Sequence, residues 1–382
     1  MEKTKCLYDK FPYETEFDAN VLAVKALKEA QDRYEVILDQ TLFFPEQGGQ
    51  TPDQGWLSVG HGLRPATKCE VLDVQIRDGV IVHVIEQKLE PGDQVHGQID
   101  WDYRFSNMQQ HTGEHIFSGI VHSTFGYENV GFHLSDSVVT MDFDGVLSPE
   151  DVTAIETRVN QVIADDLVLE IAFPTPQMLE SMEYRSKKEL EGQVRIVTIP
   201  GVDVCACCAP HVDTTGQIGL IKLIGAIKYK GGMRVSMVCG FRALLDYNQK
   251  EASVVTISRK LSAKPDSIAE AVDRLQKEVE AQKEKIRILQ EQYLKGVLKE
   301  IKPEDTCVLL FEETLDTVAV RNFVNDVMRI TDGICGAFIG TDAEGYRYIL
   351  GSSKKEITNI SKEMNQTLNG RGGGRPPMVQ GS

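Results

Sequence analysis

Residues 101–122 read WDYRFSNMQQHTGEHIFSGIVH. Apolar residues and one threonine recur in this stretch at three- and four-residue steps: Phe105, Met108, Thr112, Ile116 and Ile120. This period predicts an amphipathic helix over residues 102–122. His111 and His115 lie four positions apart, so their imidazoles project from one helix face about 6 Å apart. That separation allows both rings to bind one metal ion.

A second pair of candidate ligands lies far downstream, in the segment CACCAPH at residues 205–211. Cys207 and His211 again lie four positions apart, and their thiolate and imidazole complement the first pair. We expect the two pairs together to hold one Zn²⁺, because tetrahedral zinc prefers such His and Cys ligands. Composition does not decide between four protein ligands and three ligands with a water. Cys205 and Cys208 are spare thiols, and Cys208 is an alternative to Cys207, although the four-residue spacing favours Cys207.

The first histidine pair also allows a different interpretation. His111-Thr-Gly-Glu-His115 matches His-x-x-Glu-His, the inverted zinc-protease signature in which Glu114 would serve as general base. That interpretation requires a downstream glutamate as third ligand, whereas Cys207 and His211 already supply softer ligands at suitable spacing. The protease therefore ranks second.

Upstream of the helix, short β-branched or aromatic runs alternate with turn signals. These runs predict strands at residues 35–39, 71–76, 80–85 and 95–99. Residues 1–100 are therefore expected to form a small antiparallel sheet or barrel. The intervening segment Phe43–Gly55 reads FFPEQGGQTPDQG, whose glycines permit unusual backbone angles and close approach, so it turns the chain or cradles a ligand.

Downstream, the pattern changes from mixed elements to a long helix and back. Strand-like residues 138–143 and 168–172 bracket a helix opened by Ser148-Pro149, so residues 101–245 are expected to form an α+β zinc core. Residues 246–300 are expected to be a helical or coiled-coil segment. Its seam has a period near 3.5 residues and is interrupted by Gln282: Ile268, Val272, Leu275, Val279, Ile286, Leu289 and Tyr293.

The last part of the chain is expected to be a small α/β domain over residues 301–382. Strands are predicted at residues 306–311 and 334–339, and residues 370–382 read GRGGGRPPMVQGS, which indicates a glycine loop on this domain. The fold class expected for the whole chain is α+β, with an N-terminal barrel, a zinc core, a helical segment and this C-terminal domain.

Composition limits the setting in which the protein works. The 382 residues suggest two or three domains, and no apolar run reaches the roughly 18 residues of a membrane span. The N-terminus lacks the apolar region of a secretory signal, and eight cysteines are too few for a disulfide scaffold. We therefore expect a cytoplasmic protein with no membrane contact.

The net charge of −16 argues against general binding to polyanions. One segment, residues 219–242, is an exception because it has five basic residues and no acidic one: Lys222, Lys228, Lys230, Arg234 and Arg242. This segment either contacts phosphates or balances acidic groups elsewhere in the fold.

At this point the motifs carry a resemblance. Their order is the one found in the editing region of alanyl-tRNA synthetase: the Gly48-Gly49-Gln50 core of Phe43–Gly55, His111-x-x-x-His115, Cys207-x-x-x-His211 with Thr215-Gly216-x-Ile218-Gly219, and Gly372-Gly-Gly-Arg-Pro. The chain resembles the freestanding alanyl-tRNA editing proteins of the long AlaX type over essentially its whole length, and its C-terminal part is similar to a DHHA1 domain. One departure is that the synthetase usually reads Cys-Gly-Gly-Thr-His where this chain has Cys207-Cys-Ala-Pro-His211.

The resemblance implies zinc-dependent hydrolysis of the ester that joins serine, and sometimes glycine, to tRNA(Ala). A synthetase pocket made for a methyl group distinguishes such neighbours by only about 1–3 kcal/mol, so a second hydrolytic site is needed. Gly48, Gly49 and Gln50 would line the amino-acid pocket. Thr112 or His133 would hydrogen-bond the serine hydroxyl or the terminal ribose.

The tRNA itself is expected to contact basic side chains in two places: Lys228, Lys230, Arg234, Arg371 and Arg375. By resemblance the C-terminal region also mediates a homodimer. A third interpretation, a non-catalytic RNA-binding module stabilised by zinc, stays open because it shares the metal ligands and the basic segment with the deacylase.

Overall fold

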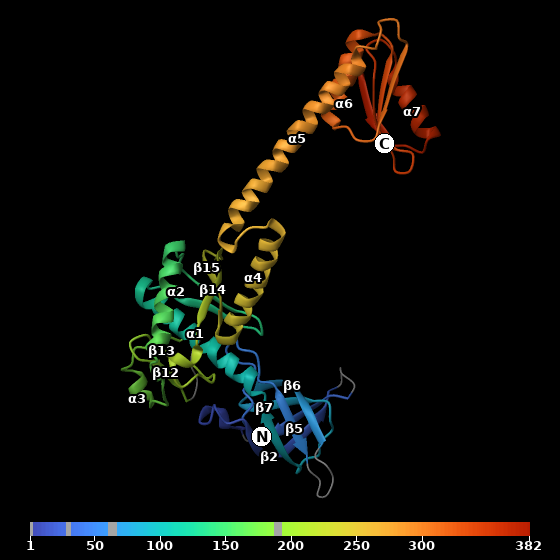
Figure 1. The fold of residues 1–382 in the computed structure, drawn as a ribbon. Coiled ribbons are helices and arrows are strands. Elements are labelled where there is room, and N and C mark those ends of the chain that lie inside the picture. The colour runs from blue at the N-terminus through green and yellow to red at the C-terminus, as the bar shows by residue number, and fades with distance from the viewer. Residues whose placement is uncertain (1–2, 28–31, 60–66, 187–192) are drawn as a thin grey trace. The chain divides into compact units, whose positions relative to one another are not determined.

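A computed structural model describes residues 3–27, 32–59, 67–186 and 193–382. The chain forms two compact units, Met1–Ala252 and Ser253–Ser382, and the fold is α+β with a closed β-barrel, as the sequence predicts (Figure 1). Within the described ranges, no helix combines the length and apolar composition that a membrane crossing needs.

The N-terminal barrel is built from antiparallel strands in the order β2-β3-β7-β6-β5-β8. Four of these strands follow the predicted runs closely, and β2 and β5 were not predicted. The six strands are β2 (Glu16–Ala26), β3 (Tyr34–Leu38), β5 (Gly55–Val59), β6 (Thr67–Arg77), β7 (Val80–Ile85) and β8 (Gln94–Ile99). Residues 16–21 of β2 alternate between exposed and buried positions, as in a strand with one face on a core. Three short elements belong to the same part of the chain but are not barrel strands: β1 (Lys5–Cys6), η1 (Leu7–Asp9) and β4 (Gln40–Thr41).

Helix α1 (Trp101–Phe125) is the centre of the following core. The side chain of Asp100 accepts a hydrogen bond from Tyr103 N and caps the first turn, and Gly126, with φ of 70°, ends the helix in the left-handed conformation. The prediction of a helix is confirmed, but the helix is not amphipathic. Residues 107–121 are buried on every face, polar side chains included, because α1 contacts α2, β9, β13 and β15.

Two small sheets and a second helix surround α1. One sheet has the order β14-β15-β10-β9 and the other β11-β12-β13. Their strands are β9 (Asn129–Leu134), β10 (Val139–Phe143), β11 (Glu170–Ala172), β12 (Ile196–Ile199), β13 (Asp203–Ala206), β14 (Ile221–Tyr229) and β15 (Gly232–Cys239). Helix α2 (Pro149–Ala164) begins where predicted, with Ser148 and Asp151 forming a capping box. Short helices α3 (Pro176–Leu179) and η2 (Thr215–Ile218) complete this core, and α4 (Gly240–Leu261) contains the boundary between the two units.

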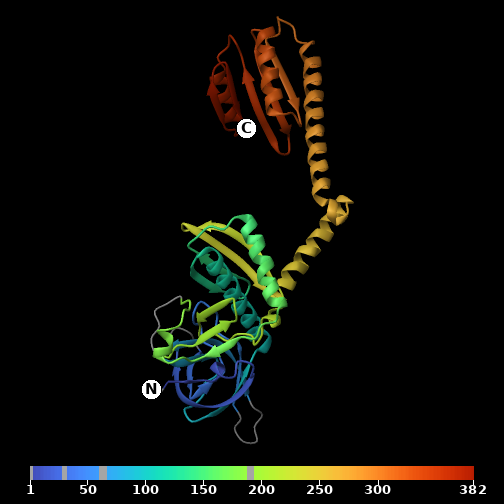
Figure 2. The same cartoon turned by 90° about the vertical axis from the view of Figure 1, so that its left-hand side faces the viewer.

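The second unit holds the long predicted helix, α5 (Ile268–Leu298), after the short η3 (Pro265–Ser267). Its sheet has the order β16-β17-β18-β20-β19, with α5 and α6 on one face and α7 on the other (Figure 2). The elements are β16 (Cys307–Glu312), α6 (Thr317–Ile330), β17 (Ile334–Thr341), β18 (Gly345–Gly351), α7 (Ile357–Thr367), β19 (Gly372–Arg375) and β20 (Met378–Gly381). The prediction of a glycine loop is wrong for residues 372–375, which pair with β20 as an edge strand.

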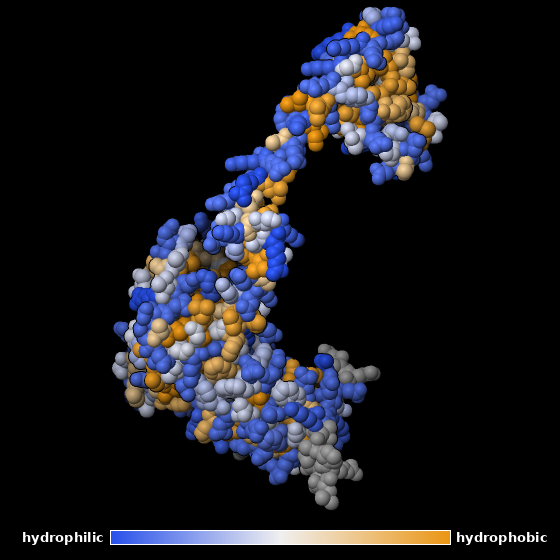
Figure 3. All heavy atoms as spheres, in the orientation of Figure 1, coloured by the Kyte–Doolittle hydropathy of each residue, from blue (hydrophilic) through white to orange (hydrophobic). Residues whose placement is uncertain are grey.

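The apolar seam of α5 is largely exposed within this unit. Six of its residues are 37–56% exposed: Val272, Leu275, Val279, Ile286, Leu289 and Tyr293. Figure 3 shows apolar side chains on the otherwise hydrophilic surface of this helix. The hydrophobic core of the unit lies farther along, where Leu294 packs with α6 and the inner face of the sheet.

Candidate metal centre and its cavity

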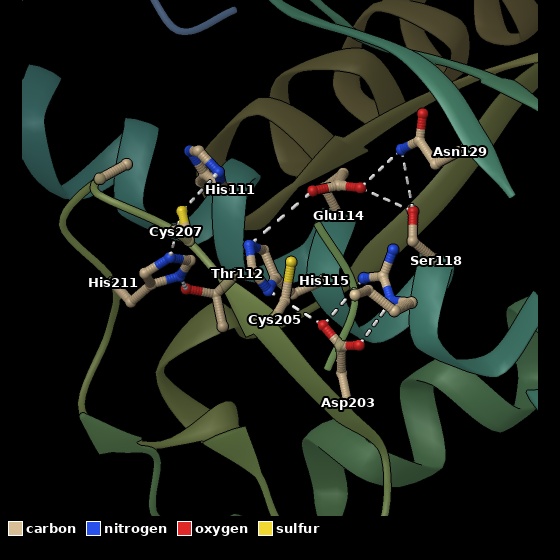
Figure 4. A network of polar contacts seen from close by, with 12 residues as sticks. His111, Thr112, Glu114, His115, Ser118, Asn129, Asp203, Cys205, Cys207 and His211 are labelled. Carbon is tan, nitrogen blue, oxygen red and sulfur yellow. Dashed lines mark hydrogen bonds and ion pairs between the residues drawn. The ribbon is translucent and has the colours of Figure 1, made fainter. Parts of the chain in front are cut away.

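The four predicted ligands meet at one point of the first unit. His111 and His115 come from the middle of α1, and Cys207 and His211 come from the segment after β13 (Figure 4). Their ligand atoms all lie within 4.8 Å of one another. Cys207 Sγ lies 3.4 Å from His111 Nε2 and 3.3 Å from His211 Nε2.

These separations fit a tetrahedral metal ion. Zinc binds nitrogen at about 2.0–2.1 Å and sulfur at about 2.3 Å, which places neighbouring N and S ligands about 3.5 Å apart. The S–N distances of 3.4 and 3.3 Å in this site are close to that value. Two neighbouring ligand types, imidazole and thiolate, are also the ones that zinc prefers. The donor set therefore fits Zn²⁺.

Each histidine is oriented through its second ring nitrogen. Nδ1 of His111 lies 2.6 Å from Gln50 Oε1, Nδ1 of His115 lies 3.0 Å from Asp203 Oδ2, and Nδ1 of His211 lies 3.0 Å from Thr112 Oγ1. Such partners fix the ring orientation and the tautomer of metal-binding histidines.

Electrostatics distinguishes Cys207 from the other thiols. Burial raises the pKa of Cys207, but the coulombic interaction with His111 and the hydrogen bonds with His111 and His115 outweigh burial and hold the pKa well below its ordinary value. Burial raises the pKa of Cys208 to about 12 and also raises the pKa of Cys205. Cys207 is therefore the thiol most ready to bind as a thiolate.

The pKa values of the two other ligands with resolved shifts move in opposite directions. Burial lowers the pKa of His211 to about 3, so this ring stays neutral. Burial also disfavours the charged form of His115, but the hydrogen bond to Asp203 outweighs it and raises the pKa of His115 to about 9. Without a metal, the site holds a proton on His115 opposite the Cys207 thiolate, and a bound cation would replace that proton.

Asp203 is itself held by a cation, Arg185, whose side chain is 10% exposed. Arg185 donates from Nε to Asp203 Oδ1 at 2.7 Å and from NH2 to Oδ2 at 2.9 Å. Gly119 of α1 makes this arrangement possible, because a Cβ atom there would lie 2.5 Å from the carbonyl oxygen of Val202. Sequence reasoning missed both Asp203 and Arg185, and the only local signal was an acid four residues before Cys207.

The loop at residues 43–55 brings Gln50 to the metal centre. Gly48 and Gly49 have φ values of 65° and 87°, and a Cβ atom on Gly49 would lie 2.5 Å from the carbonyl oxygen of Phe132. The loop is anchored at its far end by Asp53, which forms a fully buried ion pair with Arg104 of α1. The close approach to Phe132 means that the chain needs glycine at position 49, where it passes β9.

A cavity of about 660 Å³ opens beside the ligands. Three of the four candidate ligands line the cavity, and His211 does not. The wall is formed by these ligands with residues from the loop, β9 and the segments around β13: Asp9, Gln47, Gly48, Gly49, His111, His115, Val130, Gly131, Phe132, Phe173, Ser186, Gln193, Val194, Arg195, Cys205, Ala206, Cys207, Cys208 and Ala209. Of the predicted pocket residues, Gly48 and Gly49 line it. Gln50 lies behind it, fully buried against His111.

Three other predicted residues also lie outside the cavity wall. Thr112 is buried behind His211. Glu114 is fully buried, and its Oε1 accepts hydrogen bonds from Ser118 Oγ at 2.6 Å and Asn129 Nδ2 at 2.7 Å. His133 is exposed on β9.

The protease interpretation gains no support from the metal centre. Two groups of candidate ligands occur in the described ranges, one with the four predicted residues and one with His115, Asp203 and Cys205. Neither group includes a glutamate, which the inverted motif requires as third ligand. In the second group, Asp203 already forms an ion pair with Arg185, which neutralises the Asp203 carboxylate.

Comparison with known proteins agrees with this arrangement. A family model described as tRNA synthetases class II (A) matches residues 2–103, and a model of the threonyl and alanyl tRNA synthetase second additional domain matches residues 194–236, which include Cys207 and His211. The chain is 31% identical to the alanyl-tRNA editing protein AlaX-L of Pyrococcus horikoshii, over 64% of this chain and 60% of that protein. It is 27% identical to the alanyl-tRNA editing protein Aarsd1 of Mus musculus, over 93% and 85%.

The chain is similar to alanyl-tRNA editing proteins over most of its length. It is also 32% identical to an alanine–tRNA ligase of Ignicoccus hospitalis, over 79% of this chain and 33% of the ligase. The chain therefore spans less than two thirds of each of these two relatives: 33% of the ligase and 60% of AlaX-L.

The basic side chains predicted to contact tRNA differ in availability. Lys228 and Lys230 are exposed around the β14–β15 turn, and Arg371 and Arg375 are exposed at β19. Arg234 instead donates to Asp142 across β10 and β15, at 2.6 Å from Nε and 2.7 Å from NH2. A phosphate contact of Arg234 would therefore compete with an existing ion pair.

Proposed function

We propose that this protein is a zinc-dependent deacylase that hydrolyses the ester between serine, or glycine, and tRNA(Ala). The observation that carries the proposal is the cluster of three histidines and one cysteine that opens onto a cavity of about 660 Å³. The similarity of the chain to alanyl-tRNA editing proteins supports the choice of tRNA as substrate. A synthetase pocket made for a methyl group discriminates only weakly against serine and glycine, so a second, hydrolytic site is needed to remove them from tRNA(Ala).

Each part of the site has a task in this proposal. The zinc ion would be held by His111, His115, Cys207 and His211. Once bound, it would act as a Lewis acid that polarises the ester carbonyl or lowers the pKa of a water molecule. Gln50, Asp203 and Thr112 keep the imidazole rings turned toward Cys207.

The cavity wall beside the ligands bears on substrate choice. Gly48 and Gly49 offer a wall without side chains, against which the aminoacyl group and terminal ribose can approach the backbone closely. Thr112 and His133 both lie outside this wall, so a direct contact with serine requires one of them to move. The selective contact is better sought among the residues that line the cavity.

The tRNA body would contact basic side chains outside the cavity. Lys228, Lys230, Arg371 and Arg375 are exposed and carry charges that attract phosphates. We also propose a homodimer formed through the exposed seam of α5, since such a regular apolar seam is typical of a coiled coil.

The deciding experiment measures release of labelled serine from serine-charged tRNA(Ala), beside glycine- and alanine-charged tRNA. The proposal expects release of serine and glycine by wild type, sparing of alanine, and loss of release in the double variant His111→Ala, His115→Ala. Circular dichroism of the variant controls for folding. No release by a folded, zinc-loaded wild type would contradict the proposal and favour the RNA-binding module.

A further inference from the structure

Arg195 is a cavity-lining cation that no proposed step uses. It lies directly before β12 and is only 6% exposed. Its NH1 donates to the carbonyl oxygens of Cys207 at 2.9 Å and Ala209 at 2.8 Å, and its own carbonyl oxygen accepts from Cys207 N at 3.0 Å. One edge of the guanidinium therefore braces the loop that carries Cys207.

The other edge of Arg195 is unsatisfied. Nε and NH2 are buried and have no hydrogen-bond partner, and Arg195 forms no ion pair with any residue that the structure describes. Arg104, also buried, is by contrast bound by Asp53 and by two backbone carbonyls. A guanidinium stays protonated in proteins, and an uncompensated buried charge is costly, so a partner for this edge is expected.

No residue that the structure describes supplies this partner, which indicates an anion that enters the cavity. Asp9, on the same cavity wall, is near enough for Arg195 to lower its pKa, although burial outweighs this and the pKa is raised overall. No ion pair joins the two residues in the described ranges. A ligand that entered the cavity would meet the guanidinium beside the metal ligand Cys207.

We propose that Arg195 binds the phosphodiester on the 5′ side of the terminal adenosine of the tRNA. This inference rests on the proposed function, whose substrate carries its nearest negative charge there. The α-ammonium group of the amino acid is repelled by a guanidinium, and the ester carbonyl is neutral before reaction. The planar fork of arginine matches two phosphate oxygens, and the flexible side chain can turn its free edge to the cavity.

The test uses two non-hydrolysable probes, 3′-deoxy-3′-serylamido-adenosine with and without a 5′-phosphate. Zinc-loaded wild type should bind the phosphorylated probe about tenfold or more tightly, as calorimetry would show. Arg195→Gln should abolish this preference, and Arg195→Lys should keep part of it because the charge remains without the fork. Arg158→Gln, which changes an exposed arginine of α2, is the matched control.

Several outcomes would overturn the assignment. A wild type that binds both probes equally, or neither, has no phosphate site at Arg195, whatever the variants do. An equal loss of affinity for both probes in Arg195→Gln, with zinc content unchanged, would assign the free edge to the aminoacyl group. Loss of zinc in both variants with the phosphate preference intact would leave only the brace on the Cys207 loop. Binding needs no turnover, so failure of the deacylation assay remains a separate result.

Discussion

Asp203 Oδ2 lies 3.0 Å from Nδ1 of His115, and the side chains of both residues are 2% exposed. The contact joins the start of β13 to the middle of α1, and Arg185 completes it from the other side of the carboxylate. A carboxylate in this position orients a metal-binding imidazole and makes it a better ligand.

Asp203→Asn should weaken zinc binding by about 10- to 100-fold, because the amide keeps the shape but loses the charge that orients His115. Competition with a chromophoric chelator measures the change. Asp144→Asn, at an exposed aspartate beyond β10, is the control and should leave affinity unaltered. Unchanged zinc affinity in Asp203→Asn would show that the contact only supports packing.

Cys207→Ser should lose zinc, whereas Cys205→Ser and Cys208→Ser should retain it. The reason is that only the Cys207 thiol has a lowered pKa, while burial raises the pKa of both neighbours. Metal content after gel filtration distinguishes the three variants. Retention of zinc by Cys207→Ser together with its loss from Cys208→Ser would move the ligand by one residue.

Asp53→Ala should destabilise the first unit by about 3–5 kcal/mol, because Arg104 would be left as an unpaired buried charge. Urea unfolding of the full chain can be followed by fluorescence, since both tryptophans, Trp56 and Trp101, lie in this unit. Lys88→Ala removes an exposed ion pair with Glu90 and should leave the urea midpoint almost unchanged. Similar effects of the two substitutions would refute the role given to the buried pair.

The first unit should lose stability as pH falls from about 6.5 to about 4. Burial in the barrel lowers the pKa of His83 to about 4 from its ordinary 6.5, so the unfolded chain takes up a proton before the folded one does. The full loss from this one group is roughly 3 kcal/mol and is complete below the folded pKa. His83→Gln should flatten this part of the stability–pH curve, and an unchanged slope would assign the dependence to other groups.

Ile286→Asp combined with Leu289→Asp should convert the proposed dimer into a monomer, since both side chains are more than half exposed on the α5 seam. Sedimentation velocity reports the change in mass. Lys277→Asp alters charge at an exposed position off the seam and should leave the dimer intact. A wild type that sediments as a monomer at micromolar concentration would exclude this use of the seam.

Local periodicity explains what the sequence could predict. The spacing of His111 and His115 on α1 and the apolar seam of α5 are properties of a single helix, so one segment suffices to infer them. The contacts that orient the ligands are not local, because Gln50 reaches His111 from a barrel loop and Arg185 reaches Asp203 from a separate segment.

The same limit explains two features that the sequence does not reveal. Arg234 looked available because its segment has no acid, but its partner Asp142 lies opposite it on the neighbouring strand. The glycines of β19 looked like a loop because a strand without side chains has no alternating pattern. These residues form a strand because they pair with β20, which their composition alone does not indicate.

The loop that carries Gln50 limits where the chain can be recombined with a relative. It leaves the barrel, places an amide behind His111, and is fastened to α1 through Asp53 and Arg104. A chimera that exchanged the barrel at residue 100 would therefore inherit a loop and a helix from different parents, with their charges and lengths unmatched. Recombination between relatives should tolerate crossovers near residue 252 far better than crossovers between the barrel and α1.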